Sequence, residues 1–571
     1  MPGRKFQLAD WWIVSPGQYF AIPAPIRRVT MARAAISSVL INVRATKWLR
    51  PVFRPMDYRK TSLTLALLVA CLALPYTVSG QESLLNDSWL KVQTTHFTII
   101  SQVSSRRTLR FADELETWRK IAAHMINEGV ELPQAKIPNY VYLLGDDESF
   151  NLLTFTNETA FFSPTPRANF MAVNSSSDGS FTVARHQYAH FLIRNFLDLR
   201  LPRWYEEGLA AYLARIDVTR GSGELRRFTK EDQETMVVVS EQLSTERLLY
   251  RDDALASPRV IRIANLKAES LLYYMLHAYE EEDFVDRRGN LSRYLELLLE
   301  GRNPRFAYDR AFDVTTAQLE KEFHNYLLTS RNPAGTLPIG QLAATPDYDT
   351  ANISGSELAV SLGELGLNSG QFENAQVLFQ IAVDAGTNIP RSYSGLGDSL
   401  RMQELEGMDQ TIARYFEQAL SFAVNDPDIL LDYGEYWEAE LENCDKQFPP
   451  VQRSRIVADI KRYFEQAVAL AADSPETNLA IAELYLFAGQ DWQNGLPHQE
   501  KAFSLLPADT FIMEQAVKYS IESDQYDEAE RLINELAQPI HFWGEPDWVS
   551  DLRVRLLRKR RGEAYDSCAE N

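Results

Sequence analysis

The sequence predicts an α+β domain over residues 88–350 and, after it, an all-α solenoid of repeats over residues 351–545. Three observations support this division. Short apolar runs rich in β-branched residues alternate with segments of helical periodicity in the first part. Beyond it, only helical periodicity continues. In addition, the sequence Tyr-Phe-Glu-Gln-Ala occurs at 415–419 and again at 463–467, as expected of a chain built from repeats.

Composition excludes several classes of protein. Of the 571 residues, 45% are apolar and 24% are charged, which is ordinary for globular proteins and excludes a wholly disordered or collagen-like chain. Three cysteines (Cys71, Cys444 and Cys568) are too few for a disulfide-rich scaffold or for a zinc site made of cysteine alone. The net charge of −20 argues against a general nucleic-acid binder, which needs a basic surface.

The first 80 residues differ from the rest in charge and hydropathy. Residues 1–60 carry 11 basic and 2 acidic groups, whereas residues 81–571 carry 47 basic and 76 acidic groups. Between them lies an uncharged, apolar stretch that follows two basic residues and ends in small side chains. This order predicts a cleaved secretory signal over residues 56–80, because the apolar stretch is short for a membrane span. An anchor that stays in the membrane is the alternative.

Two residues of this segment bear on where the protein goes. Met56 is the first residue of this signal, so we expect it to be the initiator and residues 1–55 to be an artefactual or disordered extension. Cys71 follows Leu-Val-Ala, which resembles a bacterial lipobox, and a lipid there would tether the protein to a membrane. The apolar residues after Cys71 favour cleavage near Gly80 instead. Either route predicts export, to a bacterial periplasm.

Periodicity and turn signals predict three strands and five helices in the α+β domain. The strands are expected at 96–100, 139–144 and 169–173, and the helices at about 104–126, 181–197, 204–215, 265–282 and 291–300.

Two histidines, His186 and His190, lie four residues apart on one predicted helix. Residues at i and i+4 project from the same helix face, so both imidazoles can reach one zinc ion. Glu207 follows 17 residues after His190, on the next helix, where it can supply a third ligand. The alternative is that the histidines are ordinary packed or solvated residues and that Glu207 is a carboxylate favoured by the helix dipole.

Residues 186–214, HQYAHFLIRNFLDLRLPRWYEEGLAAYLA, resemble the gluzincin-type core of the bacterial peptidase MA-like group. The usual form of that core is HExxH followed by a W-x-x-E-G-L-A-E-Y segment. The resemblance extends over roughly residues 88–330. It implies a zincin-like fold, metallopeptidase chemistry and a Zn²⁺ cofactor held by His186, His190 and Glu207.

The chain departs from the family pattern at two positions. The family has a glutamate after the first histidine, and this residue takes a proton from the metal-bound water. Here the residue is Gln187, whose amide cannot take that proton. The family also has an acid four residues after the glutamate ligand, where it can orient a ligand imidazole, and here that residue is Ala211. We therefore expect a folded site with impaired catalysis.

Three residues on a later helix, Tyr273, Tyr274 and His277, occupy a region where related zinc peptidases carry groups that stabilise an oxyanion. Aromatic residues at such spacing are also typical of a helix core. The sequence has no Walker loop, no convincing dinucleotide-binding glycine motif, no G-x-S-x-G and no EF-hand loop.

The second part of the chain resembles tetratricopeptide repeats. Small and aromatic residues recur at the offsets of that family, as in Gly363 with Phe379 and again in Gly397 with Phe416. About five degenerate units fit the period of roughly 34 residues. The resemblance implies stacked helix pairs that bind protein or peptide partners. An unrelated helical bundle is the alternative, and residues 546–571 are expected to form a C-terminal tail.

Three functions are compatible with these features. The first is an exported metallopeptidase-like protein that is catalytically impaired and joined to a protein-binding repeat array. The second is an active zinc peptidase that uses another base, with Glu206 as the candidate. The third is a metal-free envelope scaffold. Bound zinc distinguishes the first two from the third, and hydrolysis that a chelator abolishes distinguishes the second from the first.

Overall fold

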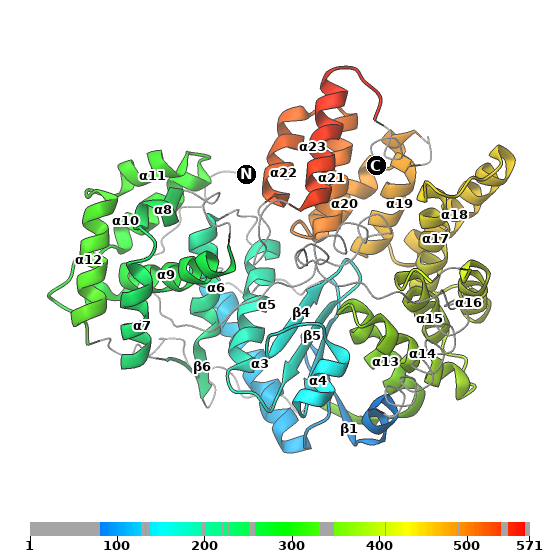
Figure 1. The fold of residues 1–571 in the computed structure, drawn as a ribbon, viewed down its shortest axis with the longest axis horizontal. Coiled ribbons are helices and arrows are strands. Elements are labelled where there is room, and N and C mark those ends of the chain that lie inside the picture. Colours follow the sequence, from blue (N-terminus) through cyan, green and yellow to red (C-terminus); the bar gives the residue numbers. More distant parts are fainter. Residues whose placement is uncertain are drawn as a thin grey trace, which may run out of the picture.

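The computed structural model in Figure 1 describes most of the chain after the predicted signal. The described residues are 80–126, 132, 136–196, 201–219, 222–226, 228–250, 257–331, 348–405, 407–487, 491–537 and 546–565. Met56, Cys71 and the signal up to Ser79 lie outside them, so the expectations about the leader stay predictions. In the part of the chain that is described, no helix is both long and apolar enough to cross a bilayer.

A mixed sheet of six strands forms the centre of the first part. The strands are β1 (Trp89–Gln93), β2 (Thr98–Ser101), β3 (Asn139–Leu144), β4 (Ala160–Pro164), β5 (Asn169–Asn174) and β8 (Asp349–Ile353). They lie in the order β4-β5-β3-β2-β1-β8. The central strands β2, β3 and β5 are parallel, whereas β4, β1 and β8 are antiparallel to their neighbours. The α+β class expected for this part is therefore confirmed.

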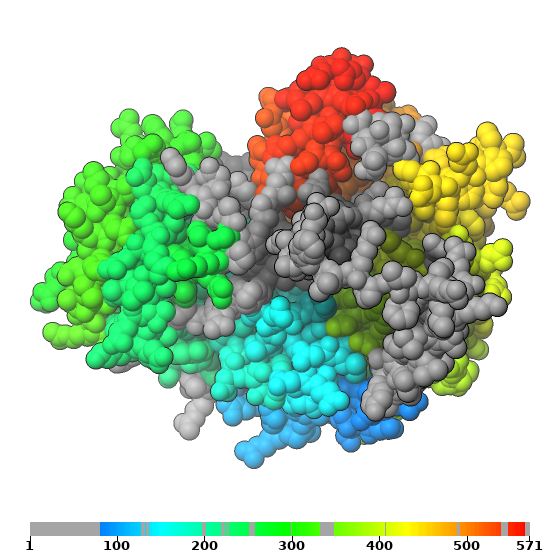
Figure 2. Space-filling model, in the orientation of Figure 1, coloured from blue at the N-terminus to red at the C-terminus, as the bar shows by residue number. Residues whose placement is uncertain are grey.

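Helices cover the sheet and extend from it to one side. They are α3 (Ser105–Ile126), α4 (Asp147–Leu153), α5 (Ser180–Phe196), α6 (Arg203–Ala214), α7 (Lys230–Ser240), α8 (Thr245–Tyr250), α9 (Pro258–His277), α10 (Arg288–Leu299), α11 (Pro304–Ala311) and α12 (Thr316–Thr329). A short hairpin of β6 (Ile216–Thr219) and β7 (Ser222–Leu225) follows α6. In the space-filling view, α7–α12 form the green lobe on the left (Figure 2).

Aromatic packing fixes the helices that carry the candidate ligands. Trp118 of α3 and Tyr188 of α5 are fully buried, with ring centroids 6.3 Å apart. The Trp118 indole N–H donates a hydrogen bond to the backbone carbonyl of Leu213, near the end of α6, at 2.7 Å. Because α3 contacts both helices, the positions of α5 and α6 are set by the core of the domain.

The second part consists of paired helices. They are α13 (Gly355–Asn368), α14 (Phe372–Asp384), α15 (Pro390–Met402), α16 (Asp409–Phe422), α17 (Pro427–Glu442), α18 (Pro450–Leu470), α19 (Pro475–Phe487), α20 (Leu496–Leu505), α21 (Thr510–Glu522) and α22 (Tyr526–Leu536). Each odd-numbered helix packs on the next even-numbered one, and successive odd-numbered helices also contact one another. The predicted array of helix pairs is confirmed.

Glycines let an aromatic ring fill the space between successive pairs. A Cβ atom on Gly363 would lie 2.9 Å from the ring of Phe379, and one on Gly395 only 2.4 Å from it. Phe379 is itself fully buried. The small and aromatic residues singled out in the sequence therefore meet at the helix contacts, as a stack of repeats requires.

Two elements extend across the predicted boundaries. Strand β8 crosses the boundary expected between residues 350 and 351 and pairs with β1, so the sheet continues past it. The segment 546–571, expected to be a tail, contains helix α23 (Asp547–Arg560), which packs on α22 and α21. Val549, Leu552 and Leu556 recur at helical spacing and are buried there.

The repeat array curves around the sheet. In Figure 1 it runs from α13, beside the sheet, through the yellow helices to α23 at the top, and the β4–β5 end of the sheet points into the curve. At one end, Leu362 of α13 shares an apolar cluster with Phe161 of β4. Toward the other end, Leu506, between α20 and α21, shares a cluster with Leu192 of α5. Each of these two apolar clusters therefore contains residues of both parts.

Candidate metal centre

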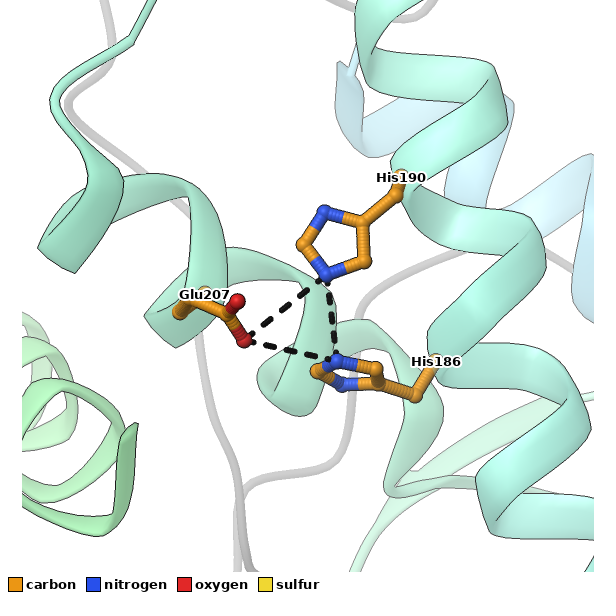
Figure 3. A group of neighbouring side chains, drawn as sticks. All are labelled: His186, His190 and Glu207. Atoms are coloured by element: carbon orange, nitrogen blue, oxygen red, sulfur yellow. Dashed lines mark hydrogen bonds and ion pairs between the residues drawn. The ribbon is translucent and has the colours of Figure 1, made fainter. Parts of the chain in front are cut away.

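His186 and His190 face each other on α5. Their Nε2 atoms lie 3.1 Å apart, and both side chains are almost completely buried. Figure 3 shows the two rings projecting from successive turns of the helix toward α6. The i, i+4 spacing predicted from the sequence thus places two imidazole nitrogens at one point.

Glu207 of α6 completes a triangle with the two histidines. Its Oε2 atom lies 3.6 Å from Nε2 of His186 and 3.8 Å from Nε2 of His190 (Figure 3). Pro202 immediately precedes α6, and its carbonyl accepts the backbone N–H of Glu206. The helix therefore begins at Arg203, and Glu207, one turn in, points back toward α5.

The spacing of the three atoms fits a zinc ion. Tetrahedral zinc with bonds of about 2.0–2.2 Å holds neighbouring ligand atoms roughly 3.3–3.6 Å apart. The three separations, from 3.1 to 3.8 Å, fall close to this range. Two imidazoles and one carboxylate are also a common ligand set of catalytic zinc sites, which keep a fourth position open. The residues present therefore fit the group.

A second glutamate orients one of the ligands. The Nδ1–H of His190 donates to Oε1 of Glu206 at 3.0 Å, which leaves Nε2 of the neutral ring as the atom with a free lone pair. Arg194, one turn after His190, donates to both oxygens of Glu206, at 2.6 and 3.2 Å. Burial by itself raises the pKa of Glu206, but Arg194 and His190 outweigh it and lower that pKa to about 2.

This contact corrects one expectation from the sequence. The alanine at position 211 was expected to leave a ligand imidazole without an orienting acid. Glu206 provides that acid from the residue before the ligand glutamate. Ala211 itself is 3% exposed and lies in packed surroundings. The support for the ligand is therefore present, although at a different position from that of the family pattern.

Asn265 of α9 holds the third candidate ligand, Glu207. Its Nδ2 donates to Oε2 of Glu207 at 3.0 Å, and its side chain is buried. Helix α9 can approach because α6 has a glycine at the crossing. A Cβ atom on Gly208 would lie 2.9 Å from the carbonyl oxygen of Ala268. Asn265 is 58 residues from Glu207, so no local signal in the sequence identified it, whereas Arg194 could have been found from its spacing to His190.

The two imidazoles differ in their tendency to bind a proton. Burial is the main cause that lowers the pKa of His186, to about 4, so this ring is neutral at pH 7. Burial also acts to lower the pKa of His190, but hydrogen bonds with Glu206 and Glu207 raise it overall. A metal ion needs neutral imidazoles, and it would compete with a proton mainly at His190.

The position of the family base is occupied by a buried amide. Gln187 is 5% exposed, and within the described residues its Oε1 has no hydrogen-bond partner. Glu206, the alternative base, is bonded to Nδ1 of His190 rather than placed beside Nε2, and its pKa of about 2 makes it a weak proton acceptor. Glu206 is therefore better placed to orient His190 than to act as a base.

The later candidates lie in the helical core. The hydroxyl of Tyr274 donates to Glu322 at 3.1 Å, and Nδ1 of His277 bonds Glu280 at 2.6 Å. Tyr273 packs against Phe228, with ring centroids 4.5 Å apart. Burial lowers the pKa of His277 well below its usual value. These contacts favour the core interpretation of the three residues over a role in stabilising an oxyanion.

Comparisons with known proteins bear on the repeat array alone. No protein-family model matches the chain, and no curated protein matches it. Solved structures similar to it include a thermophilic TPR protein of Thermus thermophilus, with 15% identity over 36% of this chain and 99% of that one, at a TM-score of 0.29. Pseudomonas aeruginosa pilF matches with 13% identity over 36% of this chain and 84% of that one, at 0.28.

A third similar structure is YrrB, described as a TPR protein with an unusual peptide-binding site. It has 15% identity over 36% of this chain and 90% of that one, at a TM-score of 0.24. Because these TM-scores are low, the repeat assignment rests on the helix packing described above. The molecule is thus a mixed α+β domain with a candidate metal site, joined to a tetratricopeptide-like array. That the domain is zincin-like stays a prediction.

Proposed function

We propose that this protein is an exported, zinc-binding, metallopeptidase-like protein in which the general base has been replaced, and that its repeat array binds a protein partner. The observation that supports zinc binding most directly is the convergence of three buried ligand atoms, with a hydrogen-bonded partner behind two of them. Burying these polar groups costs free energy unless other interactions compensate for it. A bound metal ion would supply that compensation.

His186, His190 and Glu207 would hold the ion, with Glu206 and Asn265 fixing two of them. In zinc hydrolases the metal polarises the substrate carbonyl and lowers the pKa of a bound water. Gln187 can donate or accept a hydrogen bond beside that site but cannot take up a proton. The residues of this chain can therefore bind and orient a peptide carbonyl, while the step that needs a base is lost.

A disulfide supports export. Cys444, between α17 and α18, is disulfide-bonded, and the other two cysteines of the chain, Cys71 and Cys568, lie outside the described residues. Disulfides persist in oxidising compartments such as the bacterial periplasm and are rare in the cytosol. This agrees with the secretory signal expected from the sequence. A tether through lipid at Cys71 is the alternative to a free periplasmic protein.

Metal analysis of the purified protein tests the proposal. We expect one zinc ion per chain, removable by a chelator, and loss of that zinc in His186→Ala and Glu207→Ala. His324→Ala is the matched control, since His324 lies on α12 and its side chain is 33% exposed. It should bind zinc like the wild type. A folded wild-type protein that takes up no zinc after incubation with the metal would refute the proposal and leave the metal-free scaffold.

A further inference from the structure

The contact between α6 and α9 contains a buried glutamate that lacks a hydrogen-bond partner at one oxygen. Glu269 of α9 follows Ala268, the residue that Gly208 of α6 approaches. Glu269 is 2% exposed, and in the part of the chain that the structure describes its Oε1 has no partner and its carboxylate forms no ion pair. A carboxylate removed from water without a hydrogen bond or a cation is unfavourable, so burial here favours the protonated, neutral form.

Arg215, at the end of α6, is also buried and has unused donors. It is 2% exposed, and among the described residues its Nε and Nη1 have no hydrogen-bond partner. Its Nη2 lies 3.5 Å from Oδ2 of Asp232 on α7, and its guanidinium carbon lies 4.3 Å from the centre of the Phe228 ring. The same oxygen of Asp232 accepts the backbone N–H of Thr229 at 2.8 Å. Two N–H groups of Arg215 therefore remain for another acceptor.

Arg215 is the charged group with the largest effect on Glu269. Burial raises the pKa of Glu269 to about 8, although Arg215 acts to lower it. Asp232 of α7 also acts to raise this pKa, and Arg226, which follows β7, acts to lower it. Charged groups on the other elements packed against α9 pair elsewhere, namely Lys267 with Glu320 of α12, Arg293 with Glu296 of α10, and His277 with Glu280. Arg215 is therefore the cation best placed to pair with Glu269 once it ionises.

These two residues and the hydrogen bond at the candidate metal site lie along the same helix contact. Asn265, which holds Glu207 of α6, precedes Glu269 by four residues on α9. Residues four apart on a helix share a face, so Glu269 faces α6 as Asn265 does. Arg215 follows Glu207 at the end of α6. A change at Glu269 therefore acts on the packing of the helix that carries Asn265.

We infer that Glu269 and Arg215 form a pH-sensitive switch in the contact between α6 and α9. At neutral pH, Glu269 is protonated and stays apart from Arg215. At alkaline pH, Glu269 releases its proton to solvent, and its carboxylate accepts hydrogen bonds from Nε and Nη1 of Arg215. A direct ion pair then replaces two groups that lack partners, and it draws the end of α6 toward α9. The switch goes beyond the proposed function and needs no zinc.

The first test measures the protonation state of Glu269 in the full-length, zinc-free protein. The infrared difference spectrum between the wild type and Glu269→Gln should contain the carbonyl band of a neutral carboxylic acid at pH 7 and carboxylate bands at about pH 10. Glu269→Leu replaces Glu269→Gln if that variant does not fold. Carboxylate bands already present at pH 6 would overturn the inference. Failure of both variants to fold would also overturn it, because a neutral group without partners should be replaceable.

The second test follows stability against pH. The folding equilibrium constant of the wild type, divided by that of Glu269→Gln, should fall about tenfold for each pH unit between pH 5 and 8. The reason is that the folded protein keeps a proton that an exposed glutamate of the unfolded chain has already released. Glu530→Gln is the matched control, since Glu530 is 52% exposed and pairs with Arg560. Its ratio should not change in this way, and equal slopes for both variants would contradict the switch.

The third test concerns the ion pair itself. Arg215→Gln removes the cation, so Glu269 should lose its proton at least about one pH unit higher than in the wild type. Arg226→Gln is the control, because Arg226 is 43% exposed and should shift the titration less. Each variant is compared by infrared titration with the same variant carrying Glu269→Gln, and Arg215→Met replaces Arg215→Gln if the latter does not fold. Equal shifts in the two arginine variants, or none, overturn the inference. Because zinc is absent throughout, failure here is separate from failure to bind zinc.

Discussion

Glu206 and Glu207 are neighbours in the sequence, but their carboxylates have different partners. Glu207 faces both Nε2 atoms, and Glu206 holds Nδ1 of His190. We predict that Glu206→Gln lowers zinc affinity by about 10- to 100-fold, as the loss of such a partner usually does. Competition with a chromogenic chelator measures this. Glu296→Gln, which also removes a glutamate paired with an arginine but lies on α10, is the control and should leave zinc affinity unchanged. Equal affinities in both variants would show that Glu206 does not position the ligand.

Gln187 occupies the position where the proposed function needs a general base. The wild type should hydrolyse peptides very weakly or not at all, because the amide cannot act as a base. In Gln187→Glu, we expect zinc-dependent hydrolysis to rise by about 10²–10⁴-fold, the usual contribution of a general base. A quenched fluorescent peptide library measures the rate, and Gln187→Glu combined with His190→Ala should lose it. Chelator-sensitive proteolysis by the wild type that survives Gln187→Ala would place the chemistry on another residue.

Ala211 is expected to behave differently from Gln187. Restoring the acid of the family pattern at this position would bury a second carboxylate at a site that is 3% exposed, next to a ligand that Glu206 already orients. Ala211→Glu should therefore lower stability rather than improve zinc binding. Thermal unfolding with and without zinc distinguishes these outcomes, since a functional acid would raise the unfolding temperature of the zinc-loaded form alone. Ala214→Gly, on the same helix, provides a control for disturbance of α6 without an added charge.

At the scale of elements, the close crossing of α6 and α9 brings together two residues of the candidate metal site, Glu207 and Asn265, that are far apart in sequence. Gly208→Ala would bring a Cβ atom to 2.9 Å from the backbone of Ala268 and push α9, with Asn265, away from Glu207. We predict a loss of about 1–3 kcal/mol in the free energy of unfolding, typical of overpacking, together with weaker zinc binding. Urea denaturation measures the first effect.

The control for this prediction is Gly289→Ala, because a Cβ atom at Gly289 on α10 meets open space. In a helix this change should be neutral or stabilise by up to about 1 kcal/mol. If Gly208→Ala were as stable as Gly289→Ala, and bound zinc as the wild type does, the approach of α9 would not depend on the glycine.

Elements with strong local patterns could be predicted from the sequence. Helix α5 begins and ends within one residue of its predicted range, and α6 does as well, because apolar periodicity and Pro202 mark them. Strand β8 was missed because it is mostly exposed and its partner β1 is more than 250 residues away. No local pattern encodes a pairing of that range.

In the candidate metal site, too, some residues could be predicted from the sequence and others could not. His186, His190 and Glu207 were found from spacing along two adjacent helices, and the structure brings them together. The roles of Glu206 and Asn265 depend on how α5, α6 and α9 pack, which the sequence does not specify locally. The family pattern has its orienting acid at the position of Ala211, where this chain lacks one, and it gave no indication that Glu206 contacts His190.

At the scale of the whole molecule, the α+β domain and the array form one unit. Apolar clusters join them at α13 and again at α19–α21, and Asn195, at the end of α5, accepts the backbone N–H of Ala508 at 3.2 Å. The helix that carries both histidines therefore contacts the array directly. The sequence predicted two consecutive parts, but residues 195 and 508 are too far apart for their contact to be read from it.

The disulfide state of the cysteines bears on the proposed export of the protein. Cys444 is disulfide-bonded. If the signal is cleaved near Gly80, Cys71 is removed and Cys568 is the only cysteine left to be its partner. We predict a Cys444–Cys568 bond in protein purified from the periplasm. Mass spectrometry of a digest made without reduction should find the two peptides joined, and neither cysteine should react with an alkylating agent before reduction.

The other outcomes of this measurement are equally informative. A bond to Cys71 would show that the signal segment is retained, which contradicts cleavage and favours an anchor. A free thiol at Cys444 in protein from the periplasm would contradict the bond itself and remove the support that it gives to export.

Because the bond would close a long loop, Cys444→Ser should lower the free energy of unfolding by roughly 2–5 kcal/mol under oxidising conditions. Under reducing conditions the variant and the wild type should unfold alike, since the bond is then absent from both.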